Sequence, residues 1–467
     1  MAQLGRMAVQ FAGVVLLSRL LLPEDFGLVA MVAVFLSLGD LIRDFGLSSI
    51  ALQAKELSHQ QSSNLFWTSW ALGAAAGAAL LSASPLVVAA YDEPRLAQIV
   101  PVMALNLFLG GAQAQFQVEL ARQLKFSWLA LSLFLAPALG LVLAIVTAYV
   151  GWGYWALVLQ VTGTASFLLI LQGIGARWLP SRPRRGHETR DLLLSGAQMG
   201  GTNLLTWAAN NIDSLLAGVR WGPTNLGYYN RSFQLTATLV GGFLSPLTQV
   251  AIPMLNEARK AGRRPADLLV KMQFLVVAPI SLLMVILALT APSLIPLVLG
   301  EAWAPAIPLV QILAIAECVH SLSFISYWGF LTERLSKQLL YYNLVTKPLS
   351  MVAAVIGSSW GIEGIAWGYL VGLALSWPVN LLWLTRTAGF RGMRFLVNGS
   401  RVLGTAIATY GICRLFFGRA VDEGGSWLVV FSAAVCAAGV FLALIAVFPM
   451  GRQDLARTAR VLRDFAR

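Results

Sequence analysis

The ionisable residues that interrupt the apolar segments of this chain are the first candidates for chemistry. Lys347 stands just before Pro348 in a largely aliphatic stretch. No G-x-x-x-x-G-K-[ST] loop and no H-E-x-x-H motif occurs, and the three histidines are far apart. Glu317 and His320 share a helix face, but two ligands make a poor metal site. The sequence therefore predicts no catalytic centre, no metal site and no other cofactor, and it favours a protein that binds or moves something.

A polar stripe runs along the apolar segment 192–218. Its members recur every three or four residues, so they share one helix face: Ser195, Gln198, Thr202, Thr206, Asn210 and Asp213, with Asn203 and Asn211 beside them. Such a stripe lines a polar cavity or bonds to a neighbouring helix. We expect a cavity and keep the second interpretation open.

Other charged residues lie near segment ends or close together. Asp40, Arg43 and Asp44 are three or four residues apart, which favours neutralisation within one helix over ion coupling. Glu317 is a candidate for the same two roles, structural pairing or ion coupling. Coupling to Na⁺ or H⁺ stays open.

These residues must be positioned by helices that cross a membrane. Hydrophobic residues make up 58% of the 467 residues, charged residues 12%, and mean hydropathy is +0.73. A soluble domain carries roughly a quarter charged residues, and a membrane-spanning helix needs about 20 apolar ones. The apolar runs are continuous, which indicates helices and not barrel strands. We predict an all-α integral membrane protein with about fourteen transmembrane helices, at residues 4–22, 27–50, 65–90, 97–119, 127–149, 152–174, 192–218, 232–255, 268–290, 304–331, 339–358, 362–385, 399–417 and 427–449.

The cations orient these helices. Of 33 Lys and Arg residues, 26 share alternate loops with the two termini and Lys347 alone is mid-span. The other six lie on the opposite side: Arg19, Arg95, Arg220, Arg231, Arg414 and Arg419. By the positive-inside rule both termini are cytoplasmic. The net charge of +12 then reflects topology and contact with anionic headgroups, and no nucleic-acid-binding surface is predicted.

The chain repeats internally. Pro23-Glu24-Asp25-Phe26-Gly27 returns as Pro223-Thr224-Asn225-Leu226-Gly227, residues 91–94 return as 299–303, and residues 151–156 return as 361–366. We expect each Pro-Gly segment to form an outer turn between antiparallel helices. A unit of six helices is even, so the two copies are parallel, as in paired transporter bundles. The predicted parts are an N-lobe (1–174), a cytoplasmic Arg-rich linker (175–191), a C-lobe (192–386), two further helices (387–449) and a basic cytoplasmic tail (450–467).

Several of these motifs resemble one family. They are Leu17-Ser18-Arg19-Leu20-Leu21-Leu22 with the Pro-Glu-Asp-Phe-Gly segment after it, Asp44-Phe45-Gly46-Leu47-Ser48-Ser49, Asn211-Ile212-Asp213-Ser214-Leu215-Leu216-Ala217-Gly218, Leu226-Gly227-Tyr228-Tyr229-Asn230-Arg231 and Val298-Leu299-Gly300-Glu301-Ala302-Trp303. Over roughly residues 3–390 the chain resembles the bacterial polysaccharide flippases, Wzx and especially WzxC-like. These belong to the multidrug/oligosaccharidyl-lipid/polysaccharide exporter superfamily. The resemblance also predicts a late or truncated start, because relatives carry more residues ahead of Gly5-Arg6.

This resemblance implies a transporter and not an enzyme. Its expected substrates are undecaprenyl-diphosphate-linked oligosaccharide repeat units, moved from the cytoplasmic to the periplasmic leaflet of the bacterial inner membrane for exopolysaccharide, capsule or O-antigen export. The two lobes would alternate access around a polar, partly cationic cavity. Lys347 is then a diphosphate contact, or pairs with a buried acid such as Glu317 or Asp213. Arg19, Arg220 and Arg231 receive the diphosphate late in transport, or extend to the headgroups. Membrane lipids, a polysaccharide polymerase and a chain-length regulator are expected partners.

Two other functions stay open. A drug or cation antiporter of the same superfamily would share the fold, but should favour a carboxylate-rich cavity over one with Lys347. A flippase for the peptidoglycan-precursor lipid ranks lower because of the Pro-Glu-Asp-Phe-Gly resemblance.

Overall fold

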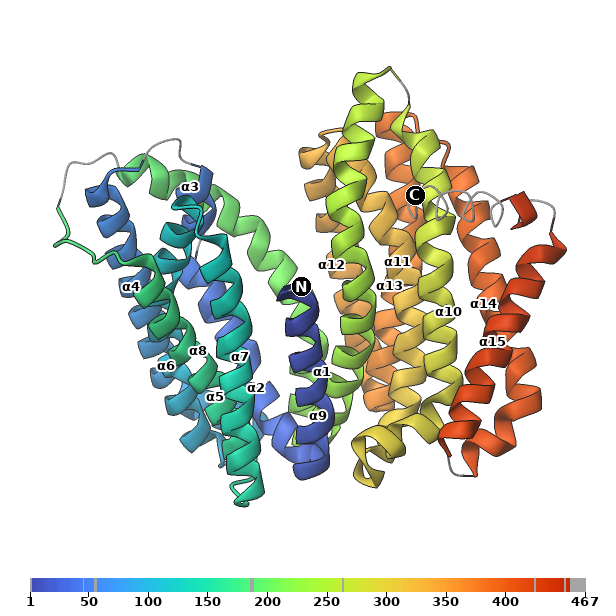
Figure 1. Cartoon of the computed structure of the whole chain (residues 1–467), viewed down its shortest axis with the longest axis horizontal. Coiled ribbons are helices and arrows are strands. Elements are labelled where there is room, and N and C mark those ends of the chain that lie inside the picture. The colour runs from blue at the N-terminus through green and yellow to red at the C-terminus, as the bar shows by residue number, and fades with distance from the viewer. Residues whose placement is uncertain are drawn as a thin grey trace. The chain divides into compact units, whose positions relative to one another are not determined.

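Helices form nearly all of the described chain (Figure 1). The computed structural model describes residues 2–44, 46–53, 57–184, 189–262, 264–423, 426–448 and 451–453, and no strand occurs among them. The helices are α1 (Ala2–Leu20), α2 (Pro23–Asp44), α3 (Leu47–Gln53), α4 (His59–Ser82), α5 (Ser84–Tyr91), α6 (Leu96–Arg122), α7 (Phe126–Tyr149), α8 (Tyr154–Ala176), α9 (Thr189–Lys260), α10 (Pro265–Leu299), η1 (Glu301–Ala306), α11 (Ile307–Thr332), α12 (Ser336–Gly357), η2 (Ser358–Trp360), α13 (Ile362–Ala388), α14 (Gly392–Asp422) and α15 (Trp427–Val447).

The fourteen predicted spans correspond to these helices. Eleven helical stretches within the described residues are long and apolar enough to cross a membrane. One of them, Leu204–Lys260 in α9, holds two predicted spans, because the backbone leaves helical geometry at Gly222 (φ 76°, ψ 179°). The shorter apolar run Phe11–Leu20 of α1 and the 31-residue α14 account for the other two. The prediction of an all-α membrane protein with about fourteen transmembrane helices is confirmed.

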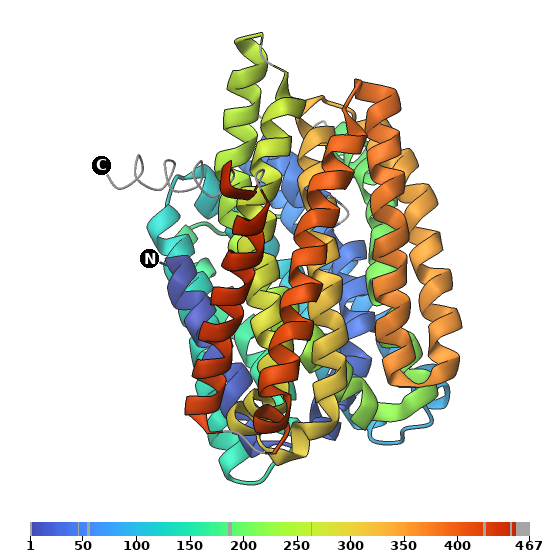
Figure 2. The same cartoon turned by 90° about the vertical axis from the view of Figure 1, so that its right-hand side faces the viewer.

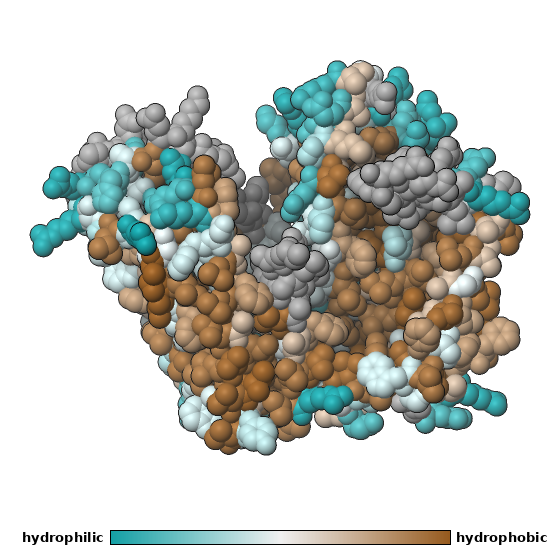
Figure 3. Space-filling model, viewed as in Figure 1, coloured by the Kyte–Doolittle hydropathy of each residue, from teal (hydrophilic) through white to brown (hydrophobic). Residues whose placement is uncertain are grey.

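The chain divides into two compact units, Met1–Gly227 and Tyr228–Arg467. Figure 3 shows apolar side chains over the middle of each unit and hydrophilic side chains at its upper end in this view, which suits a membrane-spanning surface. The lobe boundaries predicted from the repeat, including the linker 175–191, stay a prediction.

The internal repeat is visible in the backbone. Left-handed φ angles recur at positions 208 to 212 residues apart, each just beyond the end of a corresponding helix: Asp92 (51°) with Gly300 (106°), Leu124 (54°) with Arg334 (57°), Gly151 (88°) with Gly361 (94°), and Arg177 (49°) with Gly389 (64°). Three of the four non-glycine cases fall in the first copy and one in the second. Internal prolines also recur, at Pro137 in α7 and Pro348 in α12. The two copies therefore end their helices in the same way, which supports the internal repeat, while the parallel relation of the copies stays a prediction.

The Pro-Gly segments do not form the reversals that we predicted. Pro23 is the first residue of α2, a position that suits its fixed φ and missing N–H, and Gly27 is already helical and buried. In the second copy the non-helical residue is Gly222, directly before Pro223. The expectation that Gly27 and Gly227 supply the turn was wrong, because these glycines serve close packing.

In the unit Met1–Gly227, α6 packs against α2, α4 and α8, and α7 packs against α1 and α8. The rings of Phe66, Phe116 and Trp178 meet edge to face, with centroids 5.8–6.0 Å apart. Leu107 and Gly111 of α6 approach the backbone of α4 so closely that a Cβ at Gly73 or Gly111 meets main-chain atoms.

In the unit Tyr228–Arg467, α10 is the central helix and packs against α11, α14 and α15. Figure 2 views the side of this unit that α14 and α15 cover. Helices α12 and α13 cross where the backbone of Gly357 meets that of Gly364, and a Cβ on either glycine collides with the carbonyl of the other. Small residues thus set a close helix contact in this unit, as in other membrane bundles.

Candidate functional site

The described part of the polar stripe lies on the first helix of α9. Asp213 is buried, Asn210 is exposed, and Thr206 and Asn211 are half-buried. Asn211 donates from Nδ2 to the carbonyl oxygen of Trp207 (2.9 Å), and Trp207 donates from Nε1 to Ser37 Oγ on α2 (2.8 Å). The side chains of Ser195, Gln198, Thr202 and Asn203 lie outside the described residues. The bond to α2 is made by Trp207, beside the stripe, and Asn211 bonds within its own helix, so both interpretations of the stripe stay open.

The unit Tyr228–Arg467 holds two of the predicted cations, Lys347 within a predicted span and Arg231 directly before the predicted span 232–255. Arg231, on the second helix of α9, is 8% exposed and donates from a terminal guanidinium nitrogen to Gln234 Oε1 (2.7 Å). Lys347 is half-buried in α12, next to the internal Pro348. In contrast, Arg19 at the end of α1 and Arg220 on the first helix of α9 are exposed. Arg231 and Lys347 are thus the predicted cations that the structure withdraws from the surface.

Glu317 is 2% exposed in α11 and its Oε2 lies 2.9 Å from Nδ1 of His320, which is 38% exposed. The pair joins a buried carboxylate to a ring that reaches the surface of the unit. This agrees with the shared helix face predicted for the two residues. No group of three or more His, Cys, Asp or Glu residues that could hold a metal ion occurs in the described part of the chain.

Arg43 forms the structural pair predicted for α2. Its guanidinium lies 3.2 Å from Asp40 Oδ1 and donates to the carbonyl oxygen of Gly110 on α6, while Asp44 accepts from Ser48 Oγ. The side chain of Arg43 passes between α4 and α6, and a Cβ at Gly110 comes 3.1 Å from its guanidinium. Two charges of opposite sign are thereby neutralised inside one helix bundle. Periodicity identified Asp40, but only the fold identifies the contact with Gly110.

Sequence reasoning missed a cluster at the turn before α6. Arg95 pairs with Glu93 through two bonds, Nε to Oε1 (2.7 Å) and a terminal nitrogen to Oε2 (2.8 Å), and also with Glu24 of α2. The guanidinium lowers the pKa of Glu93 below its usual range, and the two carboxylates raise the pKa of Arg95. From the sequence, Arg95 is only a topology signal. No local motif points to Glu24, which is 71 residues away.

The segment after α8 is bound to the start of α4, a second feature that the sequence did not reveal. Asn64 of α4 donates to the carbonyl oxygen of Arg184 (2.8 Å) and accepts from its N–H (3.1 Å). Trp67 donates to the carbonyl oxygen of Ser181 (2.8 Å), and Trp178 donates to His59 Nδ1 (3.0 Å). Residues 177–184 of the predicted linker are therefore ordered by side chains of α4, and their cations project from a fixed backbone.

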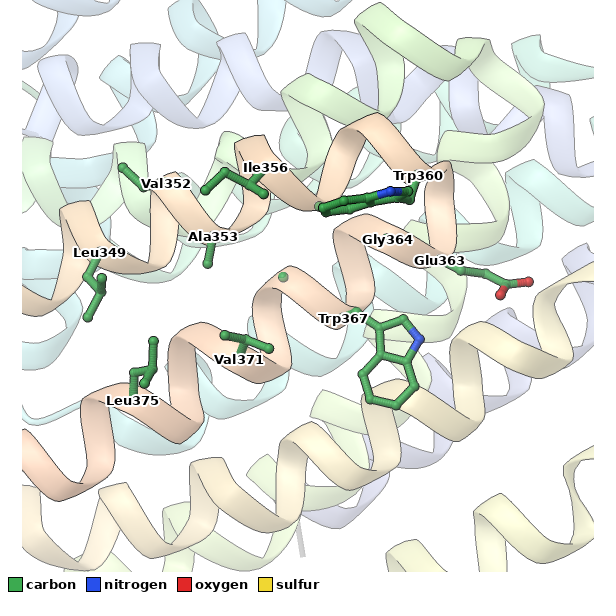
Figure 4. A pocket seen from close by; sticks show the side chains of 12 residues that line it. Leu349, Val352, Ala353, Ile356, Trp360, Glu363, Gly364, Trp367, Val371 and Leu375 are labelled. Atoms are coloured by element: carbon green, nitrogen blue, oxygen red, sulfur yellow. The ribbon is translucent and has the colours of Figure 1, made fainter.

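An apolar groove of about 520 Å³ lies between α12 and α13 (Figure 4). Leu349 and Ala353 of α12 point toward Leu375 and Val371 of α13, and Trp360 and Glu363 lie at one end. The groove exists because the glycine contact holds the two helices close at one level. Its walls suit hydrocarbon, such as a lipid chain.

Comparison with known proteins identifies relatives. The profile of a family described as polysaccharide biosynthesis protein matches residues 16–308. The lipopolysaccharide biosynthesis protein WzxC of Escherichia coli (strain K12) is 22% identical over 76% of this chain and 73% of its own length. The teichuronic acid biosynthesis protein TuaB of Bacillus subtilis (strain 168) is 26% identical over 71% and 69%. The succinoglycan biosynthesis transport protein ExoT of Rhizobium meliloti (strain 1021) is 24% identical over 68% and 64%.

Among solved structures, the inward closed conformation of the lipid II flippase MurJ matches with a TM-score of 0.76, at 12% identity, over 96% of this chain and 97% of that one. An inward-facing MATE family multidrug resistance transporter of the MOP superfamily matches with a TM-score of 0.60, at 15% identity, over 85% and 96%. At these identities the likeness shows a shared fold. The chain therefore shares the fold of the MurJ structure along nearly its full length.

Proposed function

Because the chain belongs to the polysaccharide biosynthesis protein family, we propose that it is a flippase for lipid-linked glycans. Its substrates would be undecaprenyl-diphosphate-linked oligosaccharide repeat units, moved from the cytoplasmic to the periplasmic leaflet for exopolysaccharide, capsule or O-antigen export. The names of WzxC, TuaB and ExoT, which refer to three different surface glycans, support this substrate class. They leave the glycan itself open.

The observation that carries the proposal is the placement of Arg231 and Lys347 within otherwise apolar helices. A cation at bilayer depth costs several kcal/mol unless it faces a polar cavity or a partner, and an anionic ligand that crosses the membrane can serve as such a partner. A diphosphate joined to sugars needs these contacts, because it cannot enter hydrocarbon without its hydration shell. We propose that Lys347 and Arg231 contact the diphosphate, that Asp213, Asn210 and Asn211 contact sugar hydroxyls, and that Arg19 and Arg220 contact the substrate near the membrane surface.

In this proposal the two six-helix copies alternate access to a central site, as paired repeats do in other transporters. Both termini and the linker lie in the cytoplasm, and the protein resides in the bacterial inner membrane. Reporter fusions at residue 467 and labelling of a cysteine introduced at Asp92 test this topology. We expect a cytoplasmic signal at the first position and external labelling at the second.

The activity is tested with the full chain in liposomes that contain a fluorescent undecaprenyl-diphosphate oligosaccharide. A membrane-impermeant reductant bleaches the fluorophore in the outer leaflet, so flipping appears as bleaching beyond one half. We expect bleaching to approach completion with the protein and to stop near one half in protein-free liposomes. A fluorescent phosphatidylglycerol without sugars is the specificity control. Equal flipping of both lipids, or of neither, contradicts the proposal.

A second candidate, the drug or cation antiporter, is favoured by one observation, the buried Glu317 beside His320. A carboxylate in this position can bind a proton or a cation, and under the flippase proposal it would couple transport to Na⁺ or H⁺. Liposomes with an imposed Na⁺ or proton gradient distinguish the two. A cationic dye that accumulates when the lipid-linked glycan is not flipped favours the antiporter.

A further inference from the structure

A basic pocket of about 710 Å³ opens between the first turns of α10 and α14 in the unit Tyr228–Arg467. These two helices pack side by side (Figure 1). Asp267, Val270 and Lys271 come from α10, and Gln453 comes from the segment after α15. The α14 wall consists of Arg391, Met393, Arg394, Val397, Asn398 and Arg401. Four cations thus face one carboxylate across a pocket of the size that holds small ligands.

The walls of this pocket are fixed by packing. Gln273 of α10 donates to the carbonyl oxygen of Phe395 on α14 (3.2 Å), which ties the two helices at the level of the pocket. The guanidinium of Arg401 lies 5.7 Å from the ring centroid of the buried Phe274. Arg401 is ten residues beyond Arg391, so the basic lining extends about 15 Å along α14. A flexible surface loop would not hold its cations in this way.

Within the described residues, three of the four cations that line the pocket form no ion pair. Lys271, Arg391 and Arg394 are exposed, and they make no ion pair with any acid in the described part of the chain. Helices α10 and α14 begin at Pro265 and Gly392, beside the pocket. The positive ends of both helix dipoles therefore add to the positive charge of the cations. Together these features favour an anion.

The apolar part of the lining indicates where that anion comes from. Met393 and Val397, which are 71% and 51% exposed, lie on the same α14 wall as Arg394. A free anion in water gains nothing from such neighbours, whereas a membrane lipid places its phosphate beside cations and its acyl chains beside aliphatic groups. The pocket is also at the predicted cytoplasmic ends of its helices, the leaflet in which basic pockets between transmembrane helices hold anionic headgroups.

We propose that the pocket between α10 and α14 binds the phosphate of an anionic membrane phospholipid. Lys271, Arg391 and Arg394 hold the phosphate oxygens, and Arg401 contacts them from the deeper end. Asn398 accepts a hydrogen bond from a headgroup hydroxyl, such as those of phosphatidylglycerol. Helix α12, which carries Lys347, does not line this pocket, so the lipid site is separate from the proposed diphosphate contact.

The test compares phosphatidylglycerol with phosphatidylcholine in binding titrations of the purified full chain in detergent. The triple variant Lys271→Gln, Arg391→Gln, Arg394→Gln removes three cations of the pocket. Each basic residue near a membrane surface contributes about 1 kcal/mol to anionic lipid binding, so we expect phosphatidylglycerol affinity to fall tenfold or more. The matched control, Arg182→Gln, Lys337→Gln, Arg386→Gln, removes three exposed cations elsewhere on the predicted cytoplasmic side. It should change the affinity by less than about twofold.

A gain-of-affinity variant keeps the test decisive if the triple variant folds poorly. Asp267→Asn removes the carboxylate of the pocket, and we expect it to tighten phosphatidylglycerol binding several-fold. Sodium phosphate and glycerol phosphate test the free-anion alternative. The proposal is overturned if both triple variants lose affinity equally or if Asp267→Asn has no effect. It is also overturned if sodium phosphate displaces the lipid at concentrations close to the dissociation constant of the lipid.

Discussion

Gly27 lies so close to Pro223 that a β-carbon on the glycine would collide with the proline carbonyl group. The same contact occurs in reverse, because a β-carbon on Gly227 would collide with the carbonyl group of Pro23. All four residues belong to the unit Met1–Gly227. Gly27 thus contacts the proline of the second segment, and Gly227 contacts the proline of the first. A two-fold axis produces reciprocal contacts of this kind. The two Pro-x-x-x-Gly segments therefore meet each other about a local pseudo-two-fold axis.

The first prediction concerns this contact. Gly27→Ala or Gly227→Ala should destabilise the protein by about 1–3 kcal/mol, because the added methyl group meets rigid backbone and not a side chain that can rotate away. Thermal unfolding of the purified protein, followed by tryptophan fluorescence, measures the loss. Gly411→Ala in α14 is the control, since a Cβ there meets open space. An equal loss in all three variants would show that helix glycines matter generally and this contact does not.

The second prediction concerns Lys347. Lys347→Ala should slow flipping of the lipid-linked glycan by about tenfold to a hundredfold, the loss expected when a hydrogen bond to a charged group, worth about 1.5–3 kcal/mol, is removed. Lys347→Arg should retain part of the rate because it keeps the charge. The rate is measured in the liposome assay at equal protein content. Lys337→Ala, in the first turn of the same helix, should leave flipping unchanged. Unchanged flipping in Lys347→Ala would remove this residue from the mechanism.

The third prediction concerns the cluster of Glu93, Arg95 and Glu24. Since pairing lowers the folded-state pKa of Glu93, its stabilising effect is present above the ordinary carboxyl pKa of 4.5 and is lost as the pH falls through the lower folded value. Glu93→Gln should therefore lower the melting temperature at pH 7 and have no effect in acid well below pH 4.5. The change should correspond to at most about 1 kcal/mol, because the pair is partly exposed.

The control for this cluster is Glu301→Gln, at the corresponding place in the second copy. Glu301 makes no ion pair in the described part of the chain. We expect its melting temperature to follow that of the wild type at every pH. A destabilisation by Glu93→Gln that persists in acid would contradict the assigned role of the charge.

The fourth prediction concerns residues 177–184. Asn64→Ala removes two hydrogen bonds to the backbone of Arg184, each worth about 1 kcal/mol. Local opening should rise by tenfold or more, and trypsin should cut after Arg184 at a correspondingly higher rate. Asn225→Ala removes one exposed bond within α9 and should not change that rate. Equal rates of cleavage in all three proteins would mean that the bonds to α4 do not restrain this segment.

The sequence by itself determined the fold class, the spans and the six-helix repeat. These features depend on local composition. Each membrane-spanning helix requires a continuous apolar run, and helices that correspond in the two copies end at corresponding residues. Asp92 and Leu124, with their left-handed φ, end helices of the first copy just where Gly300 and Arg334 end those of the second. The same local periodicity placed Asp40 beside Arg43 and Glu317 beside His320.

Only the tertiary structure decided which distant residues meet. Gly27 looked like a turn residue and proved to be a close-packing residue, because its neighbour is 196 positions away at Pro223. Arg95 and Arg391 looked alike as loop cations, yet one is held by Glu24 and the other faces a pocket with Lys271. Hydropathy and charge counts depend on each residue alone, whereas packing clearance and charge neutralisation depend on pairs of residues, and the folded chain sets those pairs.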